Sequence, residues 1–135
     1  MPQYFTLQEA NDKLPELTRL LQEMQEQGRQ LAAIRERTGA VQRKIRGNGY
    51  HNPIEDAPLA QGERLLEESL REGIERLAEW GIELKDLERG LVDFPALREG
   101  RTVYLCWELG EPEVAYWHET TTGFAGRQPV DDEFR

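Results

Sequence analysis

The sequence lacks most features that would mark a secreted or membrane-spanning protein. It contains one cysteine, Cys106, in 135 residues, so an internal disulfide is excluded. No apolar run approaches the roughly 20 residues that cross a bilayer. The first residues show no basic segment followed by an apolar one, so we expect no signal peptide. These absences predict a soluble protein of a reducing compartment, the cytoplasm.

Acidic residues outnumber basic ones, 26 to 17. The net charge of -9 disfavours nucleic acid as a partner, because a polyanion would be repelled at long range. The charge is unevenly distributed: residues 29–46 sum to +5 (six basic, one acidic), and residues 55–80 sum to -5 (three basic, eight acidic). The basic segment could contact RNA, but pairing between these two segments within the chain explains both sums.

The N-terminal half has the pattern of a long helix. Thr6 and Glu9 form a capping box, so we expect the helix to begin at Leu7 and to run to about Arg46. Pro15 predicts a kink or a restarted helix near Leu14. The apolar residues are spaced by three and four, as in a heptad seam. They include Leu7, Ala10, Leu14, Leu17, Leu21 and Met24.

A second helix is expected after a loop that extends to about Gln61. It runs from about Gly62 to Trp80, and Gly81 stands where a helix-terminating glycine belongs. This helix is too short to cover the whole first helix in an antiparallel hairpin. The apolar stripe of residues 7–24 therefore needs another partner: the C-terminal segment, a second protomer, or both. We expect a homodimer.

Beyond Gly81 the pattern changes to strand-like alternation. Strands are predicted over Ile82–Asp86, Leu91–Phe94 (ended by Pro95), Arg101–Leu109 and Val114–Glu119. The sequence thus predicts an α+β fold, a long antiparallel helical hairpin followed by a small antiparallel β-sheet. We expect a single domain over 1–135, made of a hairpin (1–80), a β unit (81–130) and a frayed tail (131–135).

Several short segments are spread over nearly the whole chain: Phe5–Asn11 with Leu14-Pro15, Lys85-Asp86, Gly90–Pro95, Leu105–Trp107, Gly110-Glu111, Tyr116–His118 and Gly123–Pro129. Together these segments resemble a bacterial family known as a domain of unknown function, DUF2203. The resemblance implies no activity, substrate or catalytic residue.

Cys106 and His118 form the first candidate site, as a nucleophile with its base or as two metal ligands. Whether they share a face depends on the register of the last hairpin. If the numbers of two residues paired across this hairpin sum to 223, His118 and Cys106 lie on opposite faces. If the sum is even, Cys106, Glu108, Tyr116 and His118 line one face. A buried structural cysteine beside a hydrogen-bonded histidine is the simpler interpretation.

The second candidate is a pocket for a small anionic ligand. Arg127 follows a glycine-flanked loop whose backbone N–H groups can surround a carboxylate or phosphate. In the alternative, Arg127 pairs with Asp93 or Asp86 and holds the terminal loop. The residues proposed for the pocket are Lys85, Arg89, Asp93, Trp107, Trp117, His118 and Arg127.

Other chemistry is less well supported. His51, Cys106 and His118 are the nitrogen and sulfur ligands, but their spacing matches no zinc motif, so we predict no metal and no cofactor. Asp86 and Asp93 are a further candidate, as a general acid and base, but the sequence gives this pair little support. We therefore expect a non-catalytic binding or scaffold protein that self-associates through its helices; the alternative is an anion-binding protein or enzyme with its site on the β unit.

Overall fold

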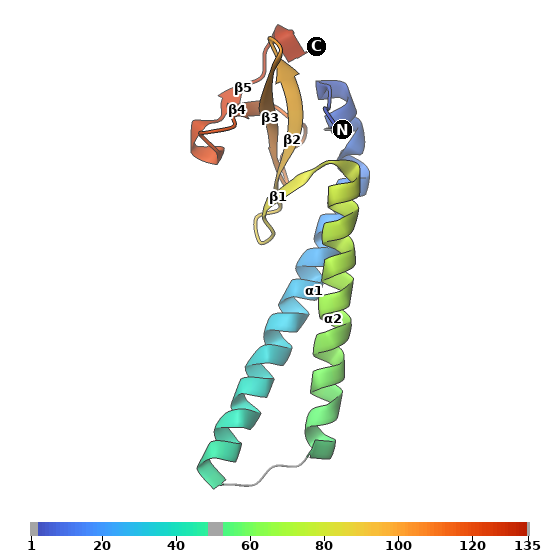
Figure 1. Ribbon diagram of the computed structural model, residues 1–135, viewed down its shortest axis with the longest axis vertical. Helices are drawn as coiled ribbons and strands as arrows, with labels where there is room; N and C mark the ends of the chain where they lie inside the picture. The colour runs from blue at the N-terminus through green and yellow to red at the C-terminus, as the bar shows by residue number, and fades with distance from the viewer. Residues whose placement is uncertain (1–2, 49–52, 135) are drawn as a thin grey trace. The chain divides into compact units, whose positions relative to one another are not determined.

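The chain folds as two helices followed by a five-stranded sheet, in the α+β class predicted from the sequence (Figure 1). The computed structural model describes the backbone of residues 3–48 and 53–134, and the side chains of residues 3–40 and 58–134. These residues form two compact units, which are described separately: Met1–Gln22 with Ile74–Arg135, and Glu23–Gly73. No described helix is long and apolar enough to span a membrane.

Helix α1 (Leu7–Asn48) begins at the predicted capping box. The amide of Glu9 donates to the Thr6 hydroxyl (3.0 Å), and the amide of Thr6 donates to the Glu9 carboxylate (2.9 Å). The helix is continuous through Pro15, so the restart considered for that position is not found. Pro15 removes a hydrogen bond, yet the helix continues past it with the neighbouring Leu17 fully buried.

Helix α2 (Pro53–Trp80) begins earlier than predicted. The prediction that the loop extends to Gln61 was wrong. Pro53 occupies the first helical position, where its missing N–H costs nothing. The predicted end at Gly81 is confirmed. Gly81 has φ 79°, its amide donates to Ala78 O, and the amide of Ile82 donates to Leu77 O, which together make a Schellman motif.

In the unit of residues 23–73, α1 and α2 pair as an antiparallel hairpin. Arg35 donates to Glu63 (3.3 Å) and to Glu67 (3.0 Å), which is the pairing that the opposite charges of the two segments predict. Gly73 lets the helices approach closely, because a Cβ at this position would lie 2.8 Å from the sulfur of Met24.

The sheet is antiparallel throughout, with the strands in chain order (Figure 1). Strand β2 passes through Pro95, contrary to the prediction that the proline ends it. The carbonyl of Pro95 accepts from the amide of Phe5, so the backbone polar groups of Pro95 face away from β3. On that side β1 pairs only with residues 91–93 of β2, so the missing N–H of Pro95 costs no hydrogen bond of the sheet. The strands are β1 (Glu83–Asp86), β2 (Leu91–Arg98), β3 (Arg101–Glu108), β4 (Tyr116–Glu119) and β5 (Gln128–Pro129).

One face of the sheet is apolar and packs against the start of α1. The ring of Phe5 stands edge-on to that of Phe94, with centroids 5.1 Å apart, and the amide of Val114 donates to the Asn11 side chain (2.7 Å). Leu17 and Leu21 of the N-terminal stripe are fully buried. These stripe residues are therefore covered within the chain itself, without a second protomer.

Residues 131–134, the described part of the predicted tail, contact the sheet. Residues Asp132–Phe134 form a 3-10 turn, and Phe134 is buried against Trp117, with ring centroids 5.8 Å apart. The guanidinium of Arg98 donates two hydrogen bonds to the carboxylate of Asp131, both at 2.9 Å. A buried aromatic ring and a bidentate ion pair thus hold this segment.

Candidate functional site

The register of the β3–β4 hairpin brings Cys106 and His118 to the same face of the sheet. Tyr104 pairs with His118 and Cys106 with Tyr116, which is the even-sum register considered above. On the other side of β3, Cys106 pairs with Asp93 of β2. Three adjacent strands therefore each place one reactive side chain on the face opposite the apolar core.

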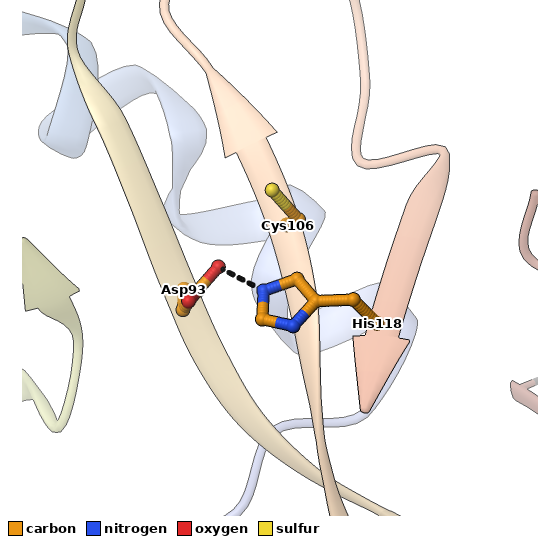
Figure 2. Close-up of side chains that lie close together, drawn as sticks. All are labelled: Asp93, Cys106 and His118. Carbon is orange, nitrogen blue, oxygen red and sulfur yellow. Dashed lines mark hydrogen bonds and ion pairs between the residues drawn. The ribbon is translucent and has the colours of Figure 1, made fainter. Parts of the chain in front are cut away.

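Figure 2 shows how these three side chains converge. Nε2 of His118 lies 3.0 Å from Oδ1 of Asp93, and the thiol of Cys106 lies beside them on the middle strand. The potential ligand atoms of the three residues all lie within 4.8 Å of one another. All three residues are almost completely buried, at 1–3% exposed. We call them the Asp93–Cys106–His118 cluster.

The contact of the second ring nitrogen of His118 shows where the ring carries a proton. Nδ1 lies 2.7 Å from the backbone carbonyl oxygen of Glu119. A carbonyl oxygen only accepts, so Nδ1 carries a proton and donates it. The short contact between Nε2 and Asp93 then requires one further proton shared by the two. Asp93 and His118 together are electrically neutral, which suits a buried pair.

Cys106 is held as a thiol. Its pKa is raised to about 12, first by burial and then by the charge of Asp93, while the Arg127 guanidinium offsets part of the rise. Both ring nitrogens of His118 are engaged elsewhere, so the histidine does not act as a base toward Cys106. The arrangement therefore does not make Cys106 an activated nucleophile.

Arg127 lies close to the cluster but pairs with an acid that the sequence analysis did not consider. Its guanidinium donates to both carboxylate oxygens of Glu111, at 2.8 and 3.0 Å, rather than to Asp93 or Asp86. It also stacks on the rings of Tyr116 (4.0 Å) and Phe124 (4.6 Å). Arg127 thus ties the terminal loop to the β3–β4 connection.

Two further cations predicted for the ligand pocket are also paired. Arg89 donates to both oxygens of Glu108, at 3.1 and 3.0 Å, and Lys85 pairs with Glu83 at 3.0 Å. Glu83 also accepts from Tyr104, and this hydrogen bond, with partial burial, raises the pKa of the Tyr104 hydroxyl to about 12.

The structure separates the predicted pocket residues into two groups. Asp93 and His118 are in contact, and Lys85 lies over the ring of Tyr104, the cross-strand neighbour of His118. Trp107 and Trp117 are buried on the apolar face, so they do not line a site on the cluster's face.

The other candidates from the sequence do not join the cluster. Asp86 accepts from the amide of Arg89 in the turn after β1, which is a local structural role. His51 lies outside the described residues.

The three side chains of the cluster are of types that can bind a metal ion; the sequence analysis considered Cys106 and His118 as metal ligands but did not include Asp93 with them. A thiolate, an imidazole and a carboxylate are all ligands of zinc, and a metal-bound histidine commonly donates its other N–H to a backbone carbonyl, as His118 does. The missing element was Asp93. It stands 13 residues before Cys106 in the chain, and only the β2–β3 register brings the two together.

The family model described as "Uncharacterized conserved protein (DUF2203)" matches residues 3–130. The chain belongs to the DUF2203 family. The match confirms the family resemblance found in the sequence, and in this DUF2203 member it covers every residue of the cluster. Neither the curated proteins nor the solved structures that were compared contain a match to the chain.

Proposed function

We propose that the protein is a non-catalytic binding protein whose ligand is a divalent transition metal held by Asp93, Cys106 and His118. The observation that carries the proposal is the convergence of three different ligand types within 4.8 Å. In a tetrahedral zinc site, bonds of about 2.0–2.3 Å put the ligand atoms roughly 3.3–3.8 Å apart. Small shifts of the side chains reach this geometry.

The ligand set favours a metal of intermediate softness. Sulfur is a poor ligand for magnesium and calcium, which bind oxygen. One thiolate, one imidazole and one carboxylate suit zinc and, as a spectroscopic substitute, cobalt. Three protein ligands leave a fourth position for a water molecule. The burial of the cluster, at 1–3% exposed, supports retention of the ion over turnover of a substrate there.

Charge balance supports the same conclusion. Without metal, the thiol proton and the proton shared by His118 and Asp93 keep the cluster neutral. A divalent cation that replaces these two protons also leaves the cluster neutral, with Cys106 as thiolate, Asp93 as carboxylate and His118 uncharged. The same buried surroundings can therefore accept either state without an uncompensated charge.

The anionic-ligand alternative stays a prediction with less support. An anion at Arg127 would have to displace Glu111, and one at Arg89 would have to displace Glu108. For the location, a thiolate ligand requires a reduced cysteine, so we keep the cytoplasm as the proposed compartment.

Titration of the chelator-treated chain with Co²⁺ tests the proposal. We expect one ion per chain, an intense thiolate-to-cobalt charge-transfer band in the near ultraviolet, and displacement by Zn²⁺. Replacing the thiol by a hydroxyl in Cys106→Ser should abolish the band and weaken Zn²⁺ binding by about 100-fold or more.

His51→Asn is the matched control, since it removes the only other histidine and should leave band and affinity unchanged. Circular dichroism checks that each variant is folded. The proposal is overturned if the wild-type chain shows no charge-transfer band, or if Cys106→Ser binds Zn²⁺ as tightly as the wild type.

A further inference from the structure

Strand β1 forms one edge of the sheet, and a groove lies beside it. Among the described residues, β1 has a single neighbour in the sheet, β2. The groove has a volume of about 500 Å³. Ile74, Leu77, Ile82 and Leu84 give it an apolar floor, and Glu83 and Lys85 line its polar side. Ile74 is 53% exposed, so a large apolar side chain is accessible beside this strand edge.

Edge strands are often protected by a lysine or a bulge, and β1 has both. Lys85 lies in the strand, and the register against β2 shifts between Leu84 and Asp86. These features discourage pairing with an arbitrary strand. They do not discourage a strand that presents an acid opposite the lysine, because Lys85, which pairs with Glu83 of its own strand at 3.0 Å, can also attract an acid across the pair.

The sequence of β1 supplies such a strand itself. Glu83 and Lys85 flank Leu84 symmetrically. In an antiparallel pair of two copies with Leu84 opposite Leu84, each Glu83 faces the Lys85 of the other copy. In a parallel pair at the same register, each residue would face its own kind, and like charges directly opposite are unfavourable. The charges thus favour one occupant and one direction.

We propose that two copies of this chain associate through antiparallel pairing of their β1 edges, with Ile74 and Leu84 of each copy covering the groove of the other. Such an interface is isologous, since the same patch meets itself about a two-fold axis. It replaces the helical stripe as the basis for a dimer, because Leu17 and Leu21 of that stripe are already covered. The argument for this interface does not rest on metal binding at the cluster.

Charge reversal of the two flanking residues tests the interface by sedimentation velocity on the full chain. The wild type should be a dimer at micromolar concentrations. Glu83→Lys places lysine opposite lysine, and Lys85→Glu places glutamate opposite glutamate. The dissociation constant of the dimer should therefore rise by about tenfold or more in each variant. An equimolar mixture of the two variants should associate again, because each lysine then faces a glutamate.

Glu113→Lys is the matched control, an exposed charge reversal outside β1 and the groove, and it should leave the dimer unchanged. Ile74→Lys, which places a charge in the apolar floor, should give monomers in the same assay. A monomeric wild type overturns the proposal. So does a dimer that persists in both charge variants, or a mixture of the variants that stays monomeric.

Discussion

At the scale of single residues, both ring nitrogens of the buried His118 have hydrogen-bond partners. The carbonyl of Glu119 fixes a proton on Nδ1, and the remaining nitrogen faces Asp93 at 3.0 Å. Both partners are buried, so neither can turn to water if the other is removed. The pair therefore acts as one unit, and the cost of breaking it should exceed the value of its hydrogen bond.

Removing one partner of this pair should be strongly destabilising. In the metal-free protein, His118→Leu leaves the Asp93 carboxyl buried without its partner and should lower the free energy of unfolding by about 3–5 kcal/mol. Urea unfolding followed by circular dichroism measures the change. The double variant with Asp93→Leu should lose clearly less than the sum of the two single variants. Additive losses would show that the two residues are not coupled.

The Cys106 thiol predicts a dependence of stability on alkaline pH. Its pKa rises from 9.0 to about 12 on folding, so between these values the folded chain retains a proton that the unfolded chain releases. Stability from this group is complete below pH 9 and is lost as the pH rises toward 12. Unfolding of the metal-free wild type should therefore become easier over this range, whereas Cys106→Ala should show a shallower decline. Parallel curves for the two proteins would contradict the assignment.

At the scale of elements, replacing glycine by alanine should change the stability differently at two positions. Gly81 ends α2 with φ 79°, a conformation that costs other residues about 1–2 kcal/mol, so Gly81→Ala should lower stability by about that amount. Gly62 lies inside α2, where alanine is the better helix former by about 1 kcal/mol. A Cβ there meets only the end of the Ile34 side chain, at 3.2 Å, so Gly62→Ala should be neutral or stabilising. Thermal unfolding compares the two, and equal shifts would contradict this account.

Element boundaries were predictable where the signal is local. The capping box at Thr6 and the glycine at position 81 involve residues within one turn, and both predictions are confirmed. The effects of the prolines on the element boundaries were predicted less accurately. Pro53 begins a helix and Pro95 lies within a strand. Whether a missing N–H matters depends on what lies opposite it, and for Pro95 that is set by where β1 ends, a long-range property.

At the scale of the whole molecule, the fold class was predictable from hydrophobic periodicity, but the site was not. Periodicity shows that Cys106 and His118 each alternate with apolar neighbours, yet it does not give the register between strands. From the sequence, Asp93 was considered as a pocket residue and as a partner of Asp86 or Arg127, but not as a partner of Cys106. It became part of a site only because three strands align it with Cys106 and His118. The covered stripe of α1 depends in the same way on contacts distant in the chain.

Anomalous diffraction from crystals of the Zn²⁺-loaded chain, recorded on both sides of the zinc absorption edge, tests the central proposal most directly. The account predicts one strong peak within about 2.0–2.3 Å of Sγ of Cys106, Nε2 of His118 and a carboxylate oxygen of Asp93. A zinc peak only elsewhere in the molecule, with Asp93 and His118 still joined by their 3.0 Å hydrogen bond, would contradict it.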